Sequence, residues 1–220
     1  MNFLSQLKNG IFASKKDLEK FSKNENAKIL VISDSHGAKE TFLSIVQTFG
    51  SKADALIFAG DGIFDLLFVI EKAKNHFSTA SWLPPVIAFV KGNNDPSFCS
   101  ADFSKDIIVP PKITMQAGKR TILVSHGHSE GVYYDYSAVQ ATAQVFGADT
   151  AIFGHTHVPA ELMGTTYIMN PGSISLPRHR SSAGFAMLEI TGKNISSIFY
   201  RIENGQKPEF IPYHPEQFYG

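Results

Sequence analysis

The chain has 220 residues, and its 20 lysine and arginine residues balance 20 aspartate and glutamate residues, so its formal net charge is zero. This length suits one domain with a sizeable core. Neutrality argues against a dedicated nucleic-acid-binding protein, although it does not exclude a nucleotide as a ligand. The single cysteine excludes an intrachain disulfide framework and favours a reducing, cytoplasmic location. No apolar run is long enough to span a membrane.

Residues 1–27 are predicted to form an N-terminal extension. Phe3, Leu4, Leu7 and Ile11 recur at roughly helical spacing, and the segment lacks the uninterrupted apolar stretch of a secretory signal. We expect one or two surface helices packed on the domain. A weak membrane-surface or partner-binding helix is the alternative, and the sequence does not choose between the two.

The first half of the remaining chain alternates strands with helices. Short β-branched and apolar runs predict buried strands, and the segments between them have helical periodicity. This alternation is typical of a parallel sheet. The predicted strands cover 27–33, 55–59 and 86–90, and the predicted helices cover 39–49 and 64–77.

The second half has a different pattern, in which short strands follow one another with only one helix. A turn at Gly118-Lys119 predicts a hairpin, and this half is expected to be mostly antiparallel. The segment 203–220 is polar and rich in proline, so an irregular tail is expected there. The predicted strands are 113–115, 121–125, 150–153, 167–169, 185–190 and 195–201, and the helix is 137–146.

Polar loops follow the predicted strands directly, at the end where each strand finishes. Ligands of α/β sheets gather at the carboxyl ends of strands, so these loops are expected to share one edge. Each loop presents aspartate, asparagine or histidine. The loops are 33–37, 60–62, 92–95, 125–128 and 154–157.

The side chains of these loops have the chemistry of a metal site. Asp34 and His36 can face one point from an extended loop, and Asp61 lies between glycines, where the backbone can approach a bound group closely. Mixed carboxylate, imidazole and amide ligands suit Mn, Fe or Zn. Seven ligands exceed the need of one tetrahedral ion and suit two ions, typically about 3.5–4 Å apart. The remaining ligands are Asn93, His126, His155 and His157.

Each motif alone is weak evidence. D-x-H and G-D occur by chance, G-N-N-D is commonly a turn, and H-x-H occurs as a surface pair. Their combination in this order, each at a strand end, is hard to attribute to chance, and five of the eight histidines fall in these loops. The other three are interpreted as structural or exposed: His76, His179 and His214.

The ordered set D-x-H, G-D, G-N-x-D, H-G-H and G-H-T-H resembles the calcineurin-like metallophosphoesterase family, and within it the small YfcE-type phosphodiesterase branch. The resemblance covers about 28–201 and includes Asn170-Pro171-Gly172-Ser173 and Pro177-Arg178. It implies an α/β sandwich of two mixed sheets packed face to face and flanked by helices, with the catalytic domain over 28–202.

The resemblance also assigns the ligands of two divalent cations, with manganese expected first and iron, zinc or nickel as alternatives. Asp61 would bridge both ions. The first ion would be held by Asp34, His36 and His157. The second would be held by Asn93, His126 and His155.

The implied reaction is hydrolysis of a phosphodiester, or alternatively a phosphomonoester, in a small-molecule substrate. Two cations lower the pKa of a shared water, and the resulting hydroxide attacks phosphorus in line. The cations then stabilise the added charge on the phosphoryl oxygens.

The sequence departs from the family pattern at Asn94, where many members carry a histidine that assists the leaving group. His128 is a candidate general acid, and a packing role is its alternative. Weak assistance would favour substrates with good leaving groups. Lys91 and Arg178 either contact a substrate phosphate or are solvated surface charges, and Asp95 is expected to orient a neighbouring loop.

Other hydrolase classes fit less well. The H-x-H-x-D-H motif of metallo-β-lactamases and the D-x-D motif of haloacid-dehalogenase phosphatases are absent. A non-catalytic scaffold of the same fold is the alternative from another class, with a retromer subunit as its precedent. Such relatives lose ligands, whereas all seven are present here. The 18 phenylalanines leave room for an apolar interface between copies of the chain or fill the core, so the oligomeric state stays open.

Overall fold

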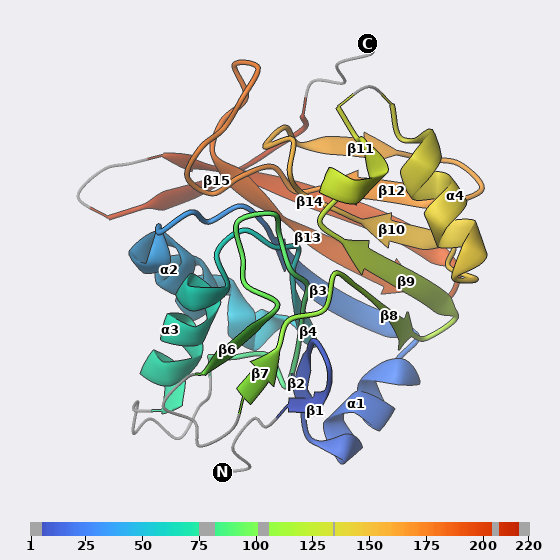
Figure 1. Cartoon of the computed structure of the whole chain (residues 1–220), viewed down its shortest axis with the longest axis horizontal. Coiled ribbons are helices and arrows are strands. Elements are labelled where there is room, and N and C mark those ends of the chain that lie inside the picture. Colours follow the sequence, from blue (N-terminus) through green and yellow to red (C-terminus); the bar gives the residue numbers. More distant parts are fainter. Residues whose placement is uncertain (1–5, 75–81, 101–105, 134, 204–206, 216–220) are drawn as a thin grey trace.

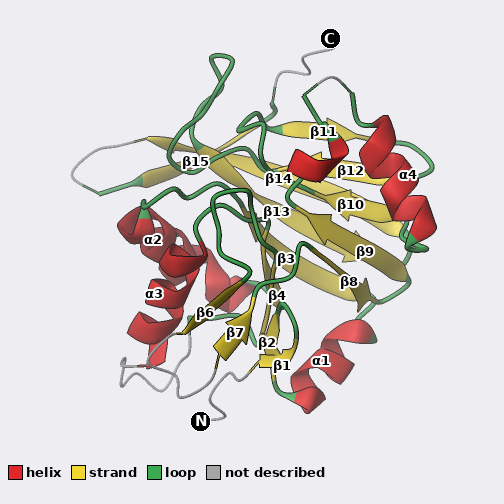
Figure 2. Ribbon diagram, viewed as in Figure 1, coloured by secondary structure: helices red, strands yellow, loops and turns green. Residues whose placement is uncertain are grey.

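The computed structural model describes residues 6–74, 82–100, 106–133, 135–203 and 207–215. Four layers are stacked in it: a helical layer, an eight-stranded sheet, a five-stranded sheet and a further helix (Figure 1, Figure 2). The sandwich of two sheets flanked by helices therefore agrees with the architecture expected from the sequence. Among the described residues, no helix has the length and apolar character that crossing a bilayer requires.

The eight-stranded sheet contains the predicted parallel strands at its centre, where β3, β4 and β5 run side by side. Every other pairing in this sheet is antiparallel. In order across the sheet the strands are β1 (Gln6–Lys8), β2 (Ile11–Ala13), β5 (Val86–Phe89), β4 (Ala55–Phe58), β3 (Asn26–Ile32), β13 (Gly184–Thr191), β14 (Asn194–Glu203) and β15 (Glu209–Tyr213).

The five-stranded sheet is mixed, with β10 parallel to both β9 and β12. Its order is β11 (Ala160–Leu162), β12 (Tyr167–Asn170), β10 (Thr150–Ile152), β9 (Arg120–Ser125) and β8 (Lys112–Ala117). A separate two-stranded ribbon pairs β6 (Phe98–Ser100) with β7 (Asp106–Ile108). The helices are α1 (Lys15–Ser22), α2 (Lys39–Phe49), α3 (Ile63–Lys74) and α4 (Ser137–Val145).

Alternating side chains of the central strands build two cores on opposite faces of one sheet. Leu30 and Ile32 of β3 lie in the core that α2 and α3 cover. Ile29 and Val31 of the same strand lie in the core between the two sheets. Because strand side chains alternate with a period of two, a continuous apolar run is what a strand buried on both faces requires. A third, smaller core packs α4 on the outer face of the five-stranded sheet.

One of the one or two helices expected in the N-terminal extension is present, as α1, but residues 6–13 form a hairpin instead of a helix. Gly10, with φ +77°, makes the turn, a conformation that favours glycine. Ile11 then pairs with β5 at the edge of the large sheet. A helix begins only after Ser14, whose hydroxyl accepts the backbone N–H of Asp17 as an N-cap.

The second half is mostly antiparallel, as expected, because most of its strand pairs run antiparallel. The exception is β10, which is parallel to both β9 and β12. One expectation for this half needs correction. The C-terminal segment is not irregular throughout, because residues 209–213 form β15. Pro212 is tolerated there because β15 is an edge strand, where a missing N–H costs no ladder bond on the open side.

Candidate metal centre

The strand-end loops predicted to carry the site converge at one edge of the sandwich. Three of them leave the parallel strands β3, β4 and β5, and the other two leave the parallel strands β9 and β10 of the facing sheet. Parallel strands end on the same side, so the loops meet without long excursions.

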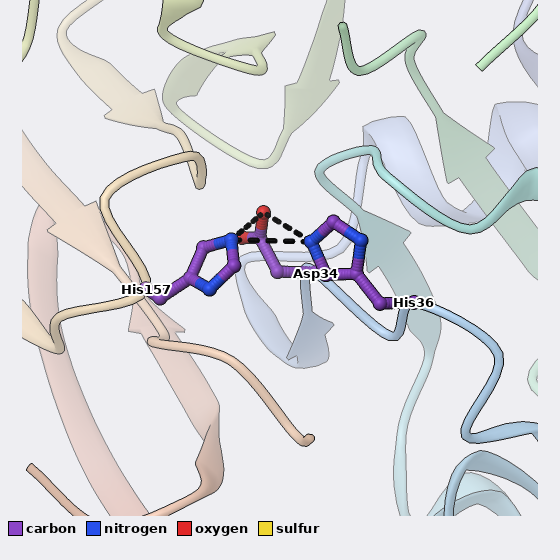
Figure 3. A group of neighbouring side chains, drawn as sticks. All are labelled: Asp34, His36 and His157. Atoms are coloured by element: carbon purple, nitrogen blue, oxygen red, sulfur yellow. Dashed lines mark hydrogen bonds and ion pairs between the residues drawn. The ribbon is translucent and has the colours of Figure 1, made fainter. Parts of the chain in front are cut away.

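The first group of side chains contains Asp34, His36 and His157, which point toward one another from two of these loops (Figure 3). The Nε2 atoms of His36 and His157 are 3.1 Å apart. The Oδ1 atom of Asp34 lies 3.2 Å from Nε2 of His157 and 3.8 Å from Nε2 of His36. Three potential ligand atoms therefore surround one point.

The second group contains Asp34, Asp61 and His126. Nε2 of His126 lies 3.4 Å from Oδ2 of Asp61, 3.8 Å from Oδ1 of Asp34 and 3.2 Å from Oδ1 of Asn93. Oδ2 of Asp61 is also 3.7 Å from Nε2 of His36. The Asp61 carboxylate thus lies between histidines of the two groups.

Most of the atoms that face these two points can only accept. His157 donates from Nδ1 to the carbonyl of Leu176 at 2.6 Å, and His126 donates from Nδ1 to the carbonyl of Ala59 at 2.7 Å. The Nε2 atom of each ring therefore faces the centre, where its lone pair can bind a cation when the ring is neutral. Oδ1 of Asp34 is buried and has no hydrogen-bond donor among the described residues. Converging acceptors, one of which has no donor among the described residues, fit a cation, and carboxylate, imidazole and amide ligands suit divalent transition metals.

The close approach of these side chains also shifts the pKa values of Asp61 and His126. Burial alone raises the pKa of Asp61, but the hydrogen bond and charge of His126 and two hydrogen bonds from Asn94 outweigh it, so the net pKa falls below its usual range. Burial alone lowers the pKa of His126, but Asp61, Asp34 and the Ala59 carbonyl raise it above the ordinary value. In the metal-free protein, positive charge is thus favoured where a cation would bind.

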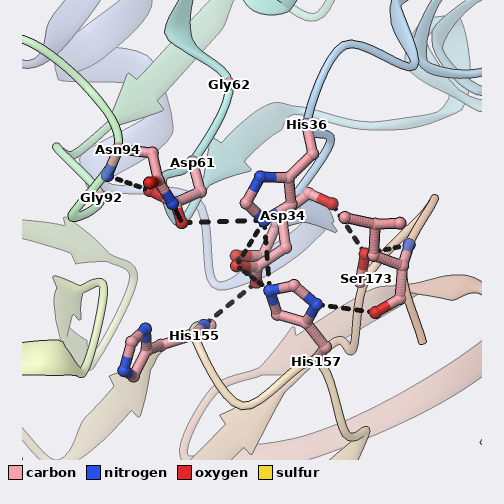
Figure 4. Close-up of polar contacts among 12 residues, drawn as sticks. Asp34, His36, Asp61, Gly62, Gly92, Asn94, His155, His157 and Ser173 are labelled. Carbon is pink, nitrogen blue, oxygen red and sulfur yellow. Dashed lines mark hydrogen bonds and ion pairs between the residues drawn. The ribbon is translucent and has the colours of Figure 1, made fainter. Parts of the chain in front are cut away.

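His155 contributes its backbone here more directly than its ring. Its N–H donates to Oδ2 of Asp34 at 3.0 Å, while the imidazole points away from Asp34 and His157 (Figure 4). The ring centroid lies 5.1 Å from that of His126 and 4.8 Å from that of Tyr133. Burial, followed by the charge of His126, lowers the pKa of His155 to about 4, which keeps the imidazole neutral.

Left-handed backbone conformations concentrate in these loops. Non-glycine residues seldom adopt positive φ, and such strain persists where the surroundings impose it. The five residues of the centre with φ between 42° and 67° are Asp34, His36, Asp61, His155 and His157.

Two glycines allow the loops to pass close to the carboxylates. A Cβ at Gly92 would lie 1.9 Å from Oδ1 of Asp61, and a Cβ at Gly154 would lie 1.9 Å from Oγ of Ser33 and 2.6 Å from Oδ2 of Asp34. Neither gap holds a methyl group, so both positions require glycine for the carboxylates to stay where they are.

A set of buried carboxylates and amides fixes the loops from behind. The Asp95 carboxylate accepts the backbone N–H groups of Asp61, Gly62, Ile63 and Gly92 at 2.8–3.0 Å, in agreement with the orienting role expected for it. From the sequence, Asn170 and Ser173 were named only as part of the family resemblance, and Asp65 was not singled out. Asp65 accepts from Ser35 and Gly37, Asn170 donates to Gly154 and Thr156, and Ser173 donates to the carbonyl of Asp34.

The remaining candidates lie around the centre or apart from it. Asn94 donates its backbone N–H and its amide to the two oxygens of Asp61, at 2.8 and 2.6 Å (Figure 4). His128 is exposed, with its ring centroid 5.5 Å from that of His126. The Lys91 ammonium donates to Ser97 and is not part of either ligand group.

Arg178 is connected to the centre through a residue that the sequence did not single out. Its Nη1 donates to the hydroxyl of Tyr133 at 2.6 Å, and that hydroxyl donates to the carbonyl of His155 at 3.2 Å. No motif marks Tyr133, which follows the H-G-H loop by several residues.

Comparison with known proteins identifies the family. The model of the calcineurin-like phosphoesterase superfamily domain matches residues 27–193. The chain belongs to this superfamily. The family assignment confirms the resemblance predicted from the strand-end motifs and the predicted enzyme class, a phosphoesterase.

The similarity to individual members of this superfamily extends over most of the chain. A probable metallophosphoesterase, YsnB of Bacillus subtilis, is 32% identical over 173 residues, which cover 78% of this chain and 89% of the relative. The phosphodiesterase YfcE of Escherichia coli is 26% identical over 179 residues, covering 74% and 87%. The structure of Vacuolar Protein Sorting 29 from Cryptosporidium parvum superposes with a TM-score of 0.65 at 17% identity, covering 86% and 99%, which shows a shared fold.

Proposed function

We propose that this chain is a phosphodiesterase that uses two divalent cations held by the converging loops. The observation that carries this proposal is the double group of acceptors around Asp34 and Asp61, with a buried carboxylate oxygen left without a donor among the described residues. The similarity to a protein named a phosphodiesterase supports diester rather than monoester cleavage.

The proposed ligands follow the two groups of side chains. Asp61 would be the ligand shared by both cations, because its Oδ2 lies 3.7 Å from Nε2 of His36 in the first group and 3.4 Å from Nε2 of His126 in the second. The first cation would be held by Asp34, His36 and His157. The second would be held by Asn93, His126 and His155, whose ring centroid lies 5.1 Å from that of His126.

Bound there, two cations would acidify a shared water and stabilise negative charge that develops on the phosphoryl oxygens. The residues of the chain supply positioning. Asn94 holds both oxygens of Asp61, and the carbonyls of Leu176 and Ala59 fix the rings of His157 and His126. Imidazole, carboxylate and amide ligands favour manganese, with iron, zinc or nickel as further candidates.

The leaving group receives little help from the chain. Asn94 donates its backbone N–H and an N–H of its amide to Asp61, and an amide is no acid at neutral pH. His128 is exposed, with its ring centroid 5.5 Å from that of His126, and its role as general acid is part of this proposal. We therefore expect small-molecule esters with good leaving groups as the preferred substrates.

The test is hydrolysis of bis-p-nitrophenyl phosphate by metal-stripped protein, with and without Mn²⁺. Turnover should appear with Mn²⁺ and fall by at least about 100-fold in Asp61→Asn, since this removes the bridging charge. Absence of turnover with Mn²⁺, Ni²⁺, Zn²⁺ and Fe²⁺ would contradict the proposal and leave the scaffold alternative. Binding of two Mn²⁺ per chain by calorimetry tests the stoichiometry separately.

A further inference from the structure

The segment that follows β12, over residues 171–178, makes hydrogen bonds directly to the proposed ligand residues of the centre. Ser173 donates its hydroxyl to the carbonyl of Asp34 at 2.7 Å, and Leu176 accepts from Nδ1 of His157 at 2.6 Å. The backbone N–H of Arg178 donates to the carbonyl of His157 at 3.3 Å. The position of this segment relative to the centre is therefore fixed by both Asp34 and His157.

The guanidinium of Arg178 is connected to His155 through Tyr133, whose hydroxyl donates to the carbonyl of His155. It donates to the hydroxyl of Tyr133 at 2.6 Å, and the Tyr133 ring lies against the His155 ring with centroids 4.8 Å apart. Both Tyr133 and Arg178 are exposed. Within the part of the chain that the structure describes, no carboxylate lies within ion-pair distance of the Arg178 guanidinium. The Arg178 guanidinium is thus oriented by a hydroxyl group, and no carboxylate of the described residues neutralises its charge.

The backbone beside Arg178 is strained although it holds no proposed ligand. His179 and Arg180 follow with φ of 52° and 62°, and both are exposed. Two consecutive non-glycine residues in this conformation are uncommon, and such strain collects at functional sites. The turn carries three consecutive residues with basic side chains, at 178–180, in a chain with no net charge.

We propose that Arg178, oriented by Tyr133, forms a subsite for a second phosphate group of the substrate, separate from the ester that is cleaved. The inference rests on the proposed phosphodiesterase function and narrows its substrate class to diesters with a further terminal phosphate. Arg178 uses one N–H on Tyr133, and its other donors remain for the paired hydrogen bonds that guanidinium groups make with phosphate oxygens. Tyr133 is a positioning residue in this arrangement, since it acts through Arg178.

The test compares thymidine dinucleotides that differ only in a terminal phosphate: TpT, pTpT and TpTp. In the presence of Mn²⁺, the wild type should show a kcat/KM at least about tenfold higher for one of the phosphorylated dinucleotides than for TpT. This preference should come from KM. In Arg178→Gln it should shrink to within about threefold, and in Tyr133→Phe, which keeps the ring and loses the acceptor, it should fall partway. Arg201→Gln, which removes an arginine paired with Glu203 on β14, is the matched control and should keep the full preference.

Two results would overturn the subsite: equal kcat/KM for all three dinucleotides in the wild type, or a preference that survives in Arg178→Gln. Failure of the proposed function is recognised separately, by the absence of bis-p-nitrophenyl phosphate hydrolysis. In that case the affinities of the dinucleotides for metal-stripped protein in EDTA still test whether the phosphate subsite exists. The phosphorylated dinucleotide should bind at least about tenfold more tightly than TpT to the wild type and lose that advantage in Arg178→Gln.

Discussion

Gly92 shows how closely the backbone must approach a side chain for the centre to form. A Cβ there would lie 1.9 Å from Oδ1 and 2.4 Å from the backbone nitrogen of Asp61. Gly92→Ala should therefore displace the Asp61 loop. A shift of about 1 Å at a catalytic group lowers the rate roughly 100-fold, so kcat/KM for bis-p-nitrophenyl phosphate should fall by that order. Steady-state kinetics at saturating Mn²⁺ measure the change.

Gly164→Ala is the matched control for this substitution. The nearest atom to a Cβ at Gly164 is the carbonyl oxygen of Thr166 at 3.5 Å, which is ordinary van der Waals contact. Its kinetics should equal those of the wild type. Equal activity of Gly92→Ala and Gly164→Ala would show that the Asp61 loop has more freedom than the contact at Gly92 allows.

Asp95 organises the Asp61 loop without facing the acceptor cluster. Its carboxylate accepts four backbone N–H groups, and asparagine offers only one oxygen for them. Groups that orient metal ligands typically contribute about 10–100-fold to metal affinity. Asp95→Asn should therefore weaken Mn²⁺ binding by that factor, as measured by calorimetry.

The control for Asp95 is Asp54→Asn, because Asp54 also accepts a backbone N–H, that of Lys28, but does so at an exposed position away from the centre. Its Mn²⁺ affinity should remain that of the wild type. If both variants bind Mn²⁺ as the wild type does, the Asp61 loop holds its shape without the Asp95 carboxylate.

The residues that face the centre could be predicted from the sequence, but many of the residues that support them could not. Asp34, His36 and Asp61 stand in short motifs at strand ends, and the strands bring those motifs together. Asp65 contacts Ser35 and Gly37 across about thirty positions, and Tyr133 meets Arg178 across 45. Such pairs carry no local pattern, because the fold alone decides which polar groups need partners.

At the scale of elements, a short 3-10 helix over His128–Glu130 leads from the H-G-H loop to Tyr133. It is tied to β8 by an ion pair of 2.7 Å between Lys112 and Glu130, whose side chains are 24% and 3% exposed. Lys112→Met leaves the Glu130 carboxylate buried without its cation. The free energy of unfolding, measured in urea, should fall by about 2 kcal/mol, because the Glu130 carboxylate then stays buried without the opposite charge that compensates for its lost hydration.

An exposed pair provides the comparison. Lys28 and Glu189 pair at 3.0 Å with side chains 54% and 40% exposed. Lys28→Met should lower the free energy of unfolding by less than about 1 kcal/mol, because water screens this pair. Adding Glu130→Gln to Lys112→Met should recover part of the lost stability. Equal effects of the two lysine substitutions would contradict the anchoring role of Lys112.

The bounds of elements with strong hydrophobic periodicity were predicted closely, but the pairing of the strands was not. The helix at 39–49 has the predicted bounds, because its apolar positions repeat with helical spacing. The parallel pairing of β10 with β9 and β12 was missed, since a three-residue strand between two others carries no signal for direction. β15 and the 6–13 hairpin were missed because proline, glycine and polar residues dilute the alternation expected of strands.

At the scale of the whole molecule, the chain adds structure on both sides of the family domain. The superfamily model begins at residue 27, yet residues 11–13 extend the large sheet past β5, and Phe21 of α1 is buried in the core between the sheets. β14 and β15 extend the opposite side of the sheet, beyond the matched region that ends at 193. The N-terminal strands also cover the β5 edge, which would otherwise offer unpaired backbone groups to other chains.

Phe12 tests whether the N-terminal extension is part of the folded core. It is 6% exposed, lies in the core beneath α2 and α3, and stacks on Phe89 with ring centroids 4.9 Å apart. Phe12→Ala removes a large buried side chain, so the free energy of unfolding should fall by about 3 kcal/mol.

Phe64→Ala is the control, because it removes the same group from a position that is 61% exposed. It should change the free energy of unfolding by less than about 0.5 kcal/mol. Urea unfolding of metal-stripped protein measures both. Mn²⁺ affinity should be unchanged in Phe12→Ala, because Phe12 packs in the core beneath α2 and α3, whereas the centre lies at the carboxyl ends of the strands. A stability loss in Phe12→Ala no larger than that in Phe64→Ala would mean that the domain folds without help from its N-terminal strands.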